Sequence, residues 1–237
     1  MLPSVDPVYS VAKGVFWPGL RWGLRWTIEG AHNIPTSGPV VLASNHVSYL
    51  DPLTLAYVAD QRRRHVRYLA KAELFDKPVL GQLLRAAHQI PVQRGRVEAA
   101  DALQAAVDAL DRGECVGVFP EGTISQDLEP MTAKSGTARL VHRAGVGITP
   151  VGLWGTHRIL TKGRKPHWQW GVPQVAVIGE PIRPAPDEHV KQTTDRMMAA
   201  IVSCVARARE LYPNTAADQE QWWWRGPDTA GAHRRTA

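Results

Sequence analysis

The sequence alternates between short strand-like runs and longer segments with helical spacing. Seven runs rich in apolar residues predict strands, at Trp26–Gly30, Val40–Ser44, Val66–Lys71, Gln89–Gln93, Cys115–Phe119, Ile148–Trp154 and Val175–Gly179. Five segments predict helices, at Pro52–Gln61, Pro78–Ala87, Val97–Arg112, Ser135–Ala144 and Glu188–Leu211. Strands that alternate with helices in this way predict an α/β layered domain with a mixed, largely parallel central sheet flanked by helices.

A histidine and an aspartate, His46 and Asp51, follow the second predicted strand. Pro52 comes next and favours the first turn of a helix, so the segment is expected to be a tight turn leading into a helix. An imidazole can take up a proton near neutral pH, and a carboxylate on its other ring nitrogen can orient it. His46 is therefore a candidate general base with Asp51 as its partner. On these residues alone, a helix cap for Asp51 and a hydrogen-bonded loop position for His46 are equally acceptable.

A second polar segment, Phe119–Ser125 (Phe-Pro-Glu-Gly-Thr-Ile-Ser), follows the strand predicted at 115–119. Together with Asn45–Asp51 it resembles the glycerolipid acyltransferase family, whose members include the 1-acylglycerol-3-phosphate (lysophosphatidate) acyltransferases. Two further blocks match in the family's order, at Ile90–Gly95, preceded by Lys71–Leu74, and at Ile148–Gly152. Four blocks in order form a specific signal, although no single block would.

This resemblance implies roles for particular side chains. His46 would be the base and Asp51 its orienting partner, and the other blocks would bind an acceptor that carries a phosphate. The implied substrate-binding residues are Lys71, Arg94, Gly95, Glu121, Gly122 and Thr123. An arginine offers a bidentate fork and a lysine a point charge for the phosphate, and the glycines let the backbone approach a ligand. Glu121 would accept hydrogen bonds from glycerol hydroxyls or brace Arg94.

The implied reaction moves a fatty acyl group from acyl-CoA or acyl carrier protein to the free hydroxyl of lysophosphatidate, which gives phosphatidate. A thioester is already an activated donor, so Ser48 is not expected to act as a nucleophile, and no cofactor or metal is expected. The two cysteines and the histidines show no metal-ligand spacing. One alternative is acylation of another lysolipid or of glycerol phosphate. Another is a non-enzymatic, basic membrane- or nucleic-acid-binding protein with the same fold.

The charge and the aromatic residues favour a membrane surface as a partner. The net charge of +6 indicates an anionic partner, but no nucleic-acid-binding module is recognisable. The segment from Val8 to Trp26 combines aromatic and basic residues, which suits the headgroup region of a bilayer, although Pro18 and Gly19 are expected to break it into two short helical pieces. The three consecutive tryptophans at 222–224 suit either a second membrane contact or packing against the domain.

These observations predict an organisation and a location for the chain. Residues 1–25 would form an amphipathic, membrane-interfacial segment, residues 26–215 the acyltransferase domain, and residues 216–237 a partly disordered tail. No run of residues is apolar and long enough for a membrane span. The protein is therefore expected at the cytoplasmic face of the membrane as a peripheral or monotopic enzyme.

Overall fold

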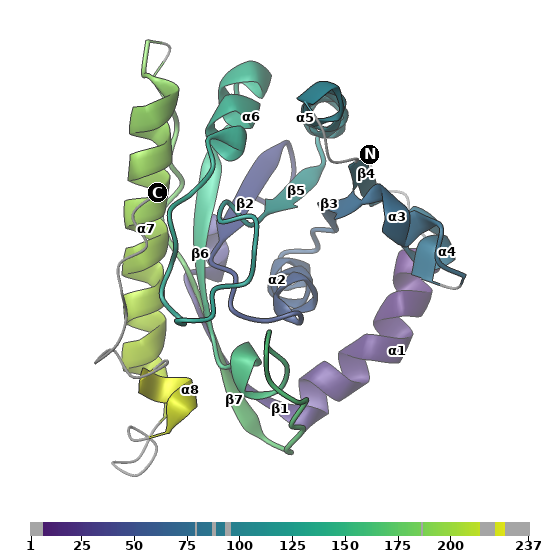
Figure 1. The fold of residues 1–237 in the computed structure, drawn as a ribbon, viewed down its shortest axis with the longest axis vertical. Coiled ribbons are helices and arrows are strands. Elements are labelled where there is room, and N and C mark those ends of the chain that lie inside the picture. The colour runs from purple at the N-terminus through teal and green to yellow at the C-terminus, as the bar shows by residue number, and fades with distance from the viewer. Residues whose placement is uncertain are drawn as a thin grey trace.

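The architecture is a seven-stranded sheet with helices on both faces (Figure 1), as a computed structural model of residues 7–78, 80–86, 89–92, 96–185, 187–213 and 221–225 shows. The strands are β1 (Leu24–Glu29), β2 (Val40–Ser44), β3 (Val66–Lys71), β4 (Ile90–Val92), β5 (Cys115–Val118), β6 (Ile148–Trp154) and β7 (Val172–Ile178). Their order across the sheet is β1-β7-β6-β2-β5-β3-β4. All neighbouring pairs are parallel except β6 and β7. The predicted mixed, largely parallel sheet is confirmed.

Helices cover each face of the sheet because the central strands are apolar on both sides. The helices are α1 (Pro7–Gly23), α2 (Asp51–Asp60), α3 (Ala72–Phe75), α4 (Leu80–Ala86), α5 (Arg96–Asp111), α6 (Gly136–Ala144), α7 (Val190–Leu211) and α8 (Trp222–Arg225). In β2, Val41 and Ala43 belong to the core under α5, α6 and α7, while Val40 and Leu42 belong to the core under α2. A strand buried on both faces reads as a continuous apolar run, as 40–44 does.

Helix α7 lies against β6 and β7 along their length (Figure 1). Its approach to β6 requires a residue without a side chain at position 152. A Cβ on Gly152 would lie 2.3 Å from the carbonyl carbon of Cys204 in α7. Gly152 therefore sets the distance between the helix and the centre of the sheet.

The expectation that Pro18 and Gly19 break the N-terminal segment is wrong, because α1 continues through both residues. Tertiary contacts on each side of the proline hold the helix in place. Before it, Lys13 and Trp17 bind the carboxylate of Asp60 at 2.7 and 2.8 Å. After it, Leu20 is buried. Such contacts override the cost of a proline within a helix.

Two further predictions concern the C-terminal part of the chain, namely the three tryptophans and the tail. The tryptophans of α8 pack against the domain: Trp223 is buried, and Trp224 lies edge-on to the ring of Trp154. Of the predicted partly disordered tail at 216–237, residues 221–225 are described and include α8, and the other residues lie outside the described part of the chain. No described helix is both long and apolar enough to cross a bilayer.

Candidate active site

The carboxyl end of β2 continues into the loop 45–50, and the Asn45 side chain fixes the point where they meet. Its amide nitrogen donates to the Leu153 carbonyl at 3.0 Å, and its amide oxygen accepts from the Leu153 N–H at 2.8 Å. The side chain thus imitates a peptide group and continues the pairing of β2 with β6. Because the side chain of Asn45 makes these bonds, its main chain can leave the sheet directly after Ser44.

His46 and Asp51 contact each other directly, with His46 Nδ1 3.0 Å from Asp51 Oδ2. The same oxygen accepts the backbone N–H groups of Val47 and Ser48, each at 2.7 Å, and the Asp51 side chain is fully buried. A carboxylate is only an acceptor, so His46 Nδ1 must carry the proton in this contact. When the imidazole is neutral, this contact selects the tautomer whose Nε2 has a free lone pair.

The second oxygen of Asp51 is bound from a distant part of the sequence. Thr156, just after β6, donates its hydroxyl to Asp51 Oδ1 at 2.7 Å. Two residues of the same connection reach the loop 45–50: Thr161 donates to the Val47 carbonyl, and Leu160 accepts from the Ser48 hydroxyl. Ser48 therefore has a structural role here. The loop has its polar groups satisfied on both sides, and it cannot shift without breaking these bonds.

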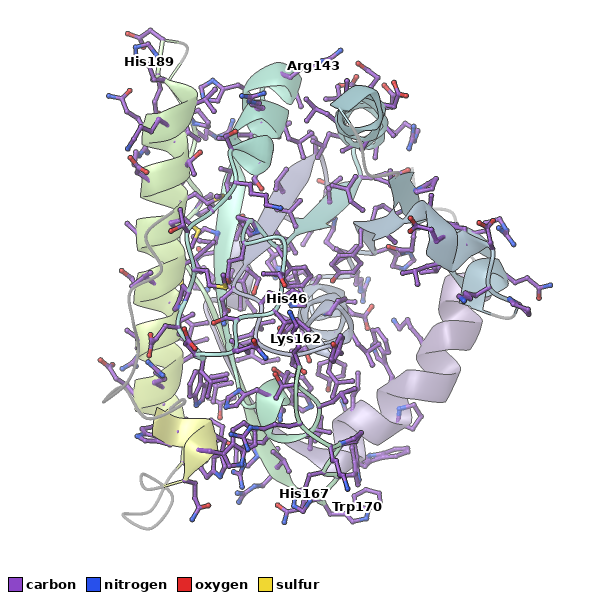
Figure 2. The ribbon with its side chains drawn as sticks, in the orientation of Figure 1. His46, Arg143, Lys162, His167, Trp170 and His189 are labelled. Carbon is purple, nitrogen blue, oxygen red and sulfur yellow. The ribbon has the colours of Figure 1, made fainter. Side chains whose placement is uncertain are left out.

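Aromatic rings form one wall beside His46. The ring of Phe119 stacks on the imidazole, with centroids 4.3 Å apart and planes 25° apart, and Tyr68 stacks beyond it. The His46 side chain is 17% exposed, so one part of the ring reaches solvent while the rest is enclosed. Figure 2 shows His46 near the centre of this view, in front of the sheet. The Asp51 carboxylate of the pair is fully buried, so bulk water is kept from it.

Glu121, at the end of the β5 segment, holds two loops together through their backbones. One oxygen accepts the His46 N–H at 2.8 Å, and the other accepts the Met131 N–H at 3.0 Å. Burial raises the pKa of this carboxyl to about 7, although both backbone bonds act in the opposite direction. The contacts of Glu121 with described residues are thus with the protein backbone, and the predicted contacts with glycerol hydroxyls or Arg94 stay a prediction because Arg94 lies outside the described residues.

The turn after Glu121 presents an exposed cation and exposed backbone. Gly122 has a φ of 71°, a conformation that favours glycine, and the Lys134 ammonium lies 3.1 Å from where a Cβ of residue 122 would be. Gly122, Thr123 and Lys134 are all exposed. The turn contacts the loop 45–50, because the Ser125 N–H donates to the His46 carbonyl at 2.7 Å. An anion placed here would lie beside a lysine on a loop that contacts His46.

The other predicted site residues can be placed only by their strands. Lys71 ends β3, but its side chain lies outside the described residues, as do Arg94 and Gly95, which follow β4. Strands β3 and β4 run parallel to each other, and β3 runs parallel to β5. Their carboxyl ends therefore meet the same edge of the sheet as Glu121, which is where ligand sites lie in such folds.

Sequence reasoning gave no role to three residues that contact His46, Asp51 or their loop: Thr156, Thr161 and Phe119. A threonine 105 residues from its partner carries no local signal of that contact.

The described residues contain no group of three His, Cys, Asp or Glu side chains that could hold a metal ion. The buried His157 has a pKa lowered to about 4 by burial, and its Nε2 lies 2.8 Å from the Trp223 carbonyl.

Comparison with known proteins gives a consistent result. The Acyltransferase family profile matches residues 25–154, more than half of the chain. A chloroplastic 1-acyl-sn-glycerol-3-phosphate acyltransferase of Arabidopsis thaliana is 32% identical over 138 residues, which cover 57% of this chain and 38% of that protein. One from Bacillus subtilis is 26% identical over 195 residues, covering 81% and 89%. The chain spans less than three fifths of the plant and algal relatives, 38% and 57% of two of them.

A solved structure also matches the fold. The 1-acyl-sn-glycerophosphate (LPA) acyltransferase PlsC from Thermotoga maritima superimposes with a TM-score of 0.72 at 25% sequence identity. The match covers 90% of this chain and 86% of that one. The similarity therefore extends well beyond the segment matched by the family profile.

Proposed function

Because this chain belongs to the acyltransferase family, we propose that it moves a fatty acyl group from a thioester donor to the free hydroxyl of lysophosphatidate, giving phosphatidate. The observation that carries this proposal is the His46–Asp51 contact at the carboxyl edge of the sheet. It supplies an imidazole whose Nδ1 faces a buried carboxylate, and whose Nε2 can accept a proton in the neutral form. The names of the relatives in Arabidopsis thaliana and Bacillus subtilis support the choice of acceptor.

In the proposed mechanism, His46 Nε2 takes the proton of the acceptor hydroxyl as its oxygen attacks the thioester carbonyl carbon. Asp51 stabilises the imidazolium that forms, in the manner of a histidine–carboxylate pair. The tetrahedral intermediate then collapses, the carbon–sulfur bond breaks, and the leaving thiolate takes the proton from His46. The products are the ester and the free thiol, and the enzyme is regenerated without a covalent intermediate.

Glu121 acts in this proposal as a positioning residue, because it holds the His46 backbone and the turn at 122–133 together. The acceptor phosphate would bind Arg94 and Lys71, with Gly95, Gly122 and Thr123 as backbone and hydroxyl contacts. The exposed Lys134 adds a cation to the same turn. Charge-assisted hydrogen bonds of this kind suit a phosphate.

Exposed apolar side chains near these loops support a lipid substrate. Tyr49, in the catalytic loop, is 56% exposed, and Met131, whose backbone binds Glu121, is 41% exposed. An acyl chain could lie against them.

The direct test is a matrix of acyl donors and acceptors with purified full-length protein. Acyl-CoA and acyl carrier protein thioesters would each be paired with lysophosphatidate, glycerol phosphate and another lysophospholipid. Lysophosphatidate should give the highest kcat/KM. If glycerol phosphate or another lysolipid were preferred, the acceptor would be wrong while the chemistry stood. No transfer with any pair would refute the enzymatic function.

The phosphate contact has its own test in Arg94→Ala. Losing a charge-assisted bond costs roughly 1.5–3 kcal/mol, so KM for lysophosphatidate should rise about ten- to a hundredfold while KM for the donor changes far less. Equal changes for both substrates, or none, would remove Arg94 from the phosphate site. Arg139→Ala, an exposed arginine on α6, is the control.

We also propose that the protein binds the cytoplasmic face of the membrane as a peripheral or monotopic protein. Trp22, at the end of α1, is 74% exposed, and Trp170 is 76% exposed. The two lie close together, because Gly23, the residue after Trp22, lies under the rings of Trp168 and Trp170. Arg21 and Arg25 flank this group. Indole rings with nearby cations suit the headgroup region of an anionic bilayer.

Liposome co-sedimentation tests the membrane proposal. Binding of the full chain should increase with the fraction of anionic lipid and decrease as salt rises, since each nearby cation contributes about 1 kcal/mol at an anionic surface. Equal binding to neutral and anionic vesicles would contradict the electrostatic part. No binding to anionic vesicles at low salt would contradict membrane association altogether.

A further inference from the structure

A basic hollow with tryptophan walls lies between the β6–β7 connection (residues 155–171) and α8. It has a volume of about 610 Å³. Its lining side chains are basic, aromatic or neutral: Arg158, Gly163, Arg164, Lys165, His167, Gln169, Gln221, Trp222 and Trp223. Pockets of this size hold small-molecule ligands in other proteins. In Figure 2 the connection descends from Lys162 to His167 and Trp170 at the lower end of the molecule.

The charge of this hollow is not balanced by the described part of the protein. None of its lining residues is acidic. Among the described residues, Arg164 and Lys165 form no ion pair with a carboxylate, whereas the exposed Lys191 and Arg207 each do. Three cationic side chains, Arg158, Arg164 and Lys165, line one hollow and therefore attract an anion.

The arginines are held in place by aromatic rings. The guanidinium of Arg164 lies 3.7 Å from the ring centroid of Trp222, and that of Arg158 lies 3.8 Å from that of Trp223. Arg158 also donates to the Tyr212 hydroxyl at 2.9 Å. A guanidinium stacked on an indole keeps the N–H donors along its edge, where they can bind a phosphate in bidentate fashion. The site is thus preorganised for a phosphate group.

The connection that forms the hollow also supports the catalytic loop. Thr156 and Thr161 bind Asp51 and the Val47 carbonyl on one side. A few residues later, Arg164 and Lys165 line the hollow. A ligand that occupied the hollow would therefore be held by the same segment that positions the base, at the carboxyl edge of the sheet.

From this arrangement we propose that the basic hollow binds the phosphates of the nucleotide portion of an acyl-CoA donor. The inference rests on the proposed function and deepens it, because it favours CoA over acyl carrier protein as the donor. CoA carries a 3′-phosphate, a diphosphate and an adenine ring, which match stacked guanidinium groups and indole walls. The prosthetic arm of a carrier protein has a single phosphate already esterified to the protein and no aromatic base.

The test compares three donors that share one acyl group: acyl-CoA, acyl-dephospho-CoA, which lacks the 3′-phosphate, and acyl-pantetheine, which lacks the nucleotide. The variant is Arg164→Ala/Lys165→Ala. It should raise KM for acyl-CoA roughly tenfold, with a smaller rise for acyl-dephospho-CoA. KM for acyl-pantetheine and kcat for all three should stay at wild-type values. A matched control, Arg139→Ala/Lys191→Ala on α6 and α7, should change none of them.

Two outcomes would overturn the proposal. Equal effects of the variant on all three donors, or no effect on any, would show that the hollow does not recognise the nucleotide. An equal loss of turnover with acyl carrier protein would show that it recognises an acidic protein surface instead.

A binding measurement separates this inference from the proposed function, because it needs no turnover. Calorimetric titration of the full chain with free CoA should give binding that the Arg164→Ala/Lys165→Ala variant weakens by about tenfold. If CoA binds in this way but no acyl transfer occurs, the site stands and the proposed function falls. If the variant instead loses only binding to phosphatidate vesicles, the hollow is a lipid-headgroup site and the inference is wrong.

Discussion

The β6–β7 connection contacts both the loop 45–51, which carries the proposed base, and the basic hollow. The polar groups of the loop have partners within the protein, whereas those of the hollow are partly without them. In the loop, Asp51 accepts four hydrogen bonds from the protein itself. In the hollow, Arg164 stacks on an indole and no described carboxylate neutralises it. The carboxylate in the loop has its hydrogen-bond partners without a ligand, whereas the positive charges of the hollow are not neutralised by any described carboxylate.

This difference is what we expect between a site that performs proton transfer and a site that binds a charged substrate. A base must have a fixed tautomer and direction before the substrate arrives, so its partners have to belong to the protein. A site for a charged substrate gains affinity only when its donors remain available to that substrate. Substitutions in the loop should therefore change kcat, and substitutions in the hollow should change KM.

The largest effect is expected from His46→Ala. Loss of a positioned general base should lower kcat about 10²- to 10⁴-fold, and the melting temperature should stay close to wild type because the side chain lies in a loop. His32→Ala, an exposed histidine before β2, is the control. Turnover within a few fold of wild type would contradict the assignment of the base.

The support for Asp51 can be reduced without touching either member of the pair, by Thr156→Val. The change keeps the shape and removes the hydroxyl that donates to Asp51 Oδ1. It should cost about 1–3 kcal/mol of unfolding free energy and lower kcat, measured by urea unfolding and steady-state kinetics. Thr161→Val removes a bond to a backbone carbonyl instead and should mainly affect stability. Equal kcat values for the two variants would mean that the Thr156 bond has no special effect on the base.

Glu121 gives the loop a pH-dependent stability. Burial raises its pKa to about 7 from an ordinary value of 4.5, so the native state binds this proton more tightly than the unfolded state. The stabilisation is complete below pH 4.5 and is lost as the pH rises through about 7. In Glu121→Gln this loss, on the order of 3 kcal/mol, should be absent from urea unfolding curves. Glu180→Gln, at an exposed carboxyl, should keep the shape of the wild-type pH curve.

The smallest effect is expected at the exposed tryptophans of the β6–β7 connection. Trp168→Ala and Trp170→Ala should each weaken vesicle binding several fold, because partial burial of an indole contributes on the order of 1 kcal/mol. Acyl transfer to a soluble, short-chain acceptor should not change. Val202→Ala, an exposed apolar residue on α7, is the control. An equal loss of turnover on soluble and vesicle-borne acceptor would contradict a role limited to the membrane.

Much of the fold follows from local patterns. The strands Val40–Ser44, Val66–Lys71 and Ile148–Trp154 begin and end at their predicted residues. The first and third are fully buried, and such strands are marked by nearly continuous apolar runs. Strand β7 begins at Val172, earlier than the predicted Val175, since Pro173 weakens the pattern while pairing with β1 extends the strand. The continuity of α1 through Pro18 depends on Asp60, a residue that no local rule connects to it.

The site was less accessible to sequence reasoning. The contact of His46 with Asp51 could be predicted, because the two residues are close in the sequence and follow a strand. The bonds of Glu121 could not, since its partners are backbone N–H groups, which every residue except proline carries. The same applies to the stacking of Arg164 on Trp222, because α8 is separated from the connection by the whole of α7.

The long separation between Asp51 and Thr156 has a consequence for protein synthesis. A ribosome delivers α1 and the catalytic loop early, but Thr156 and Thr161 follow their partners by 105 and 114 residues. Contacts between such distant residues form late, after the intervening chain has been made and ordered. The His46–Asp51 pair therefore gains these supporting hydrogen bonds only after the chain has been made as far as Thr161.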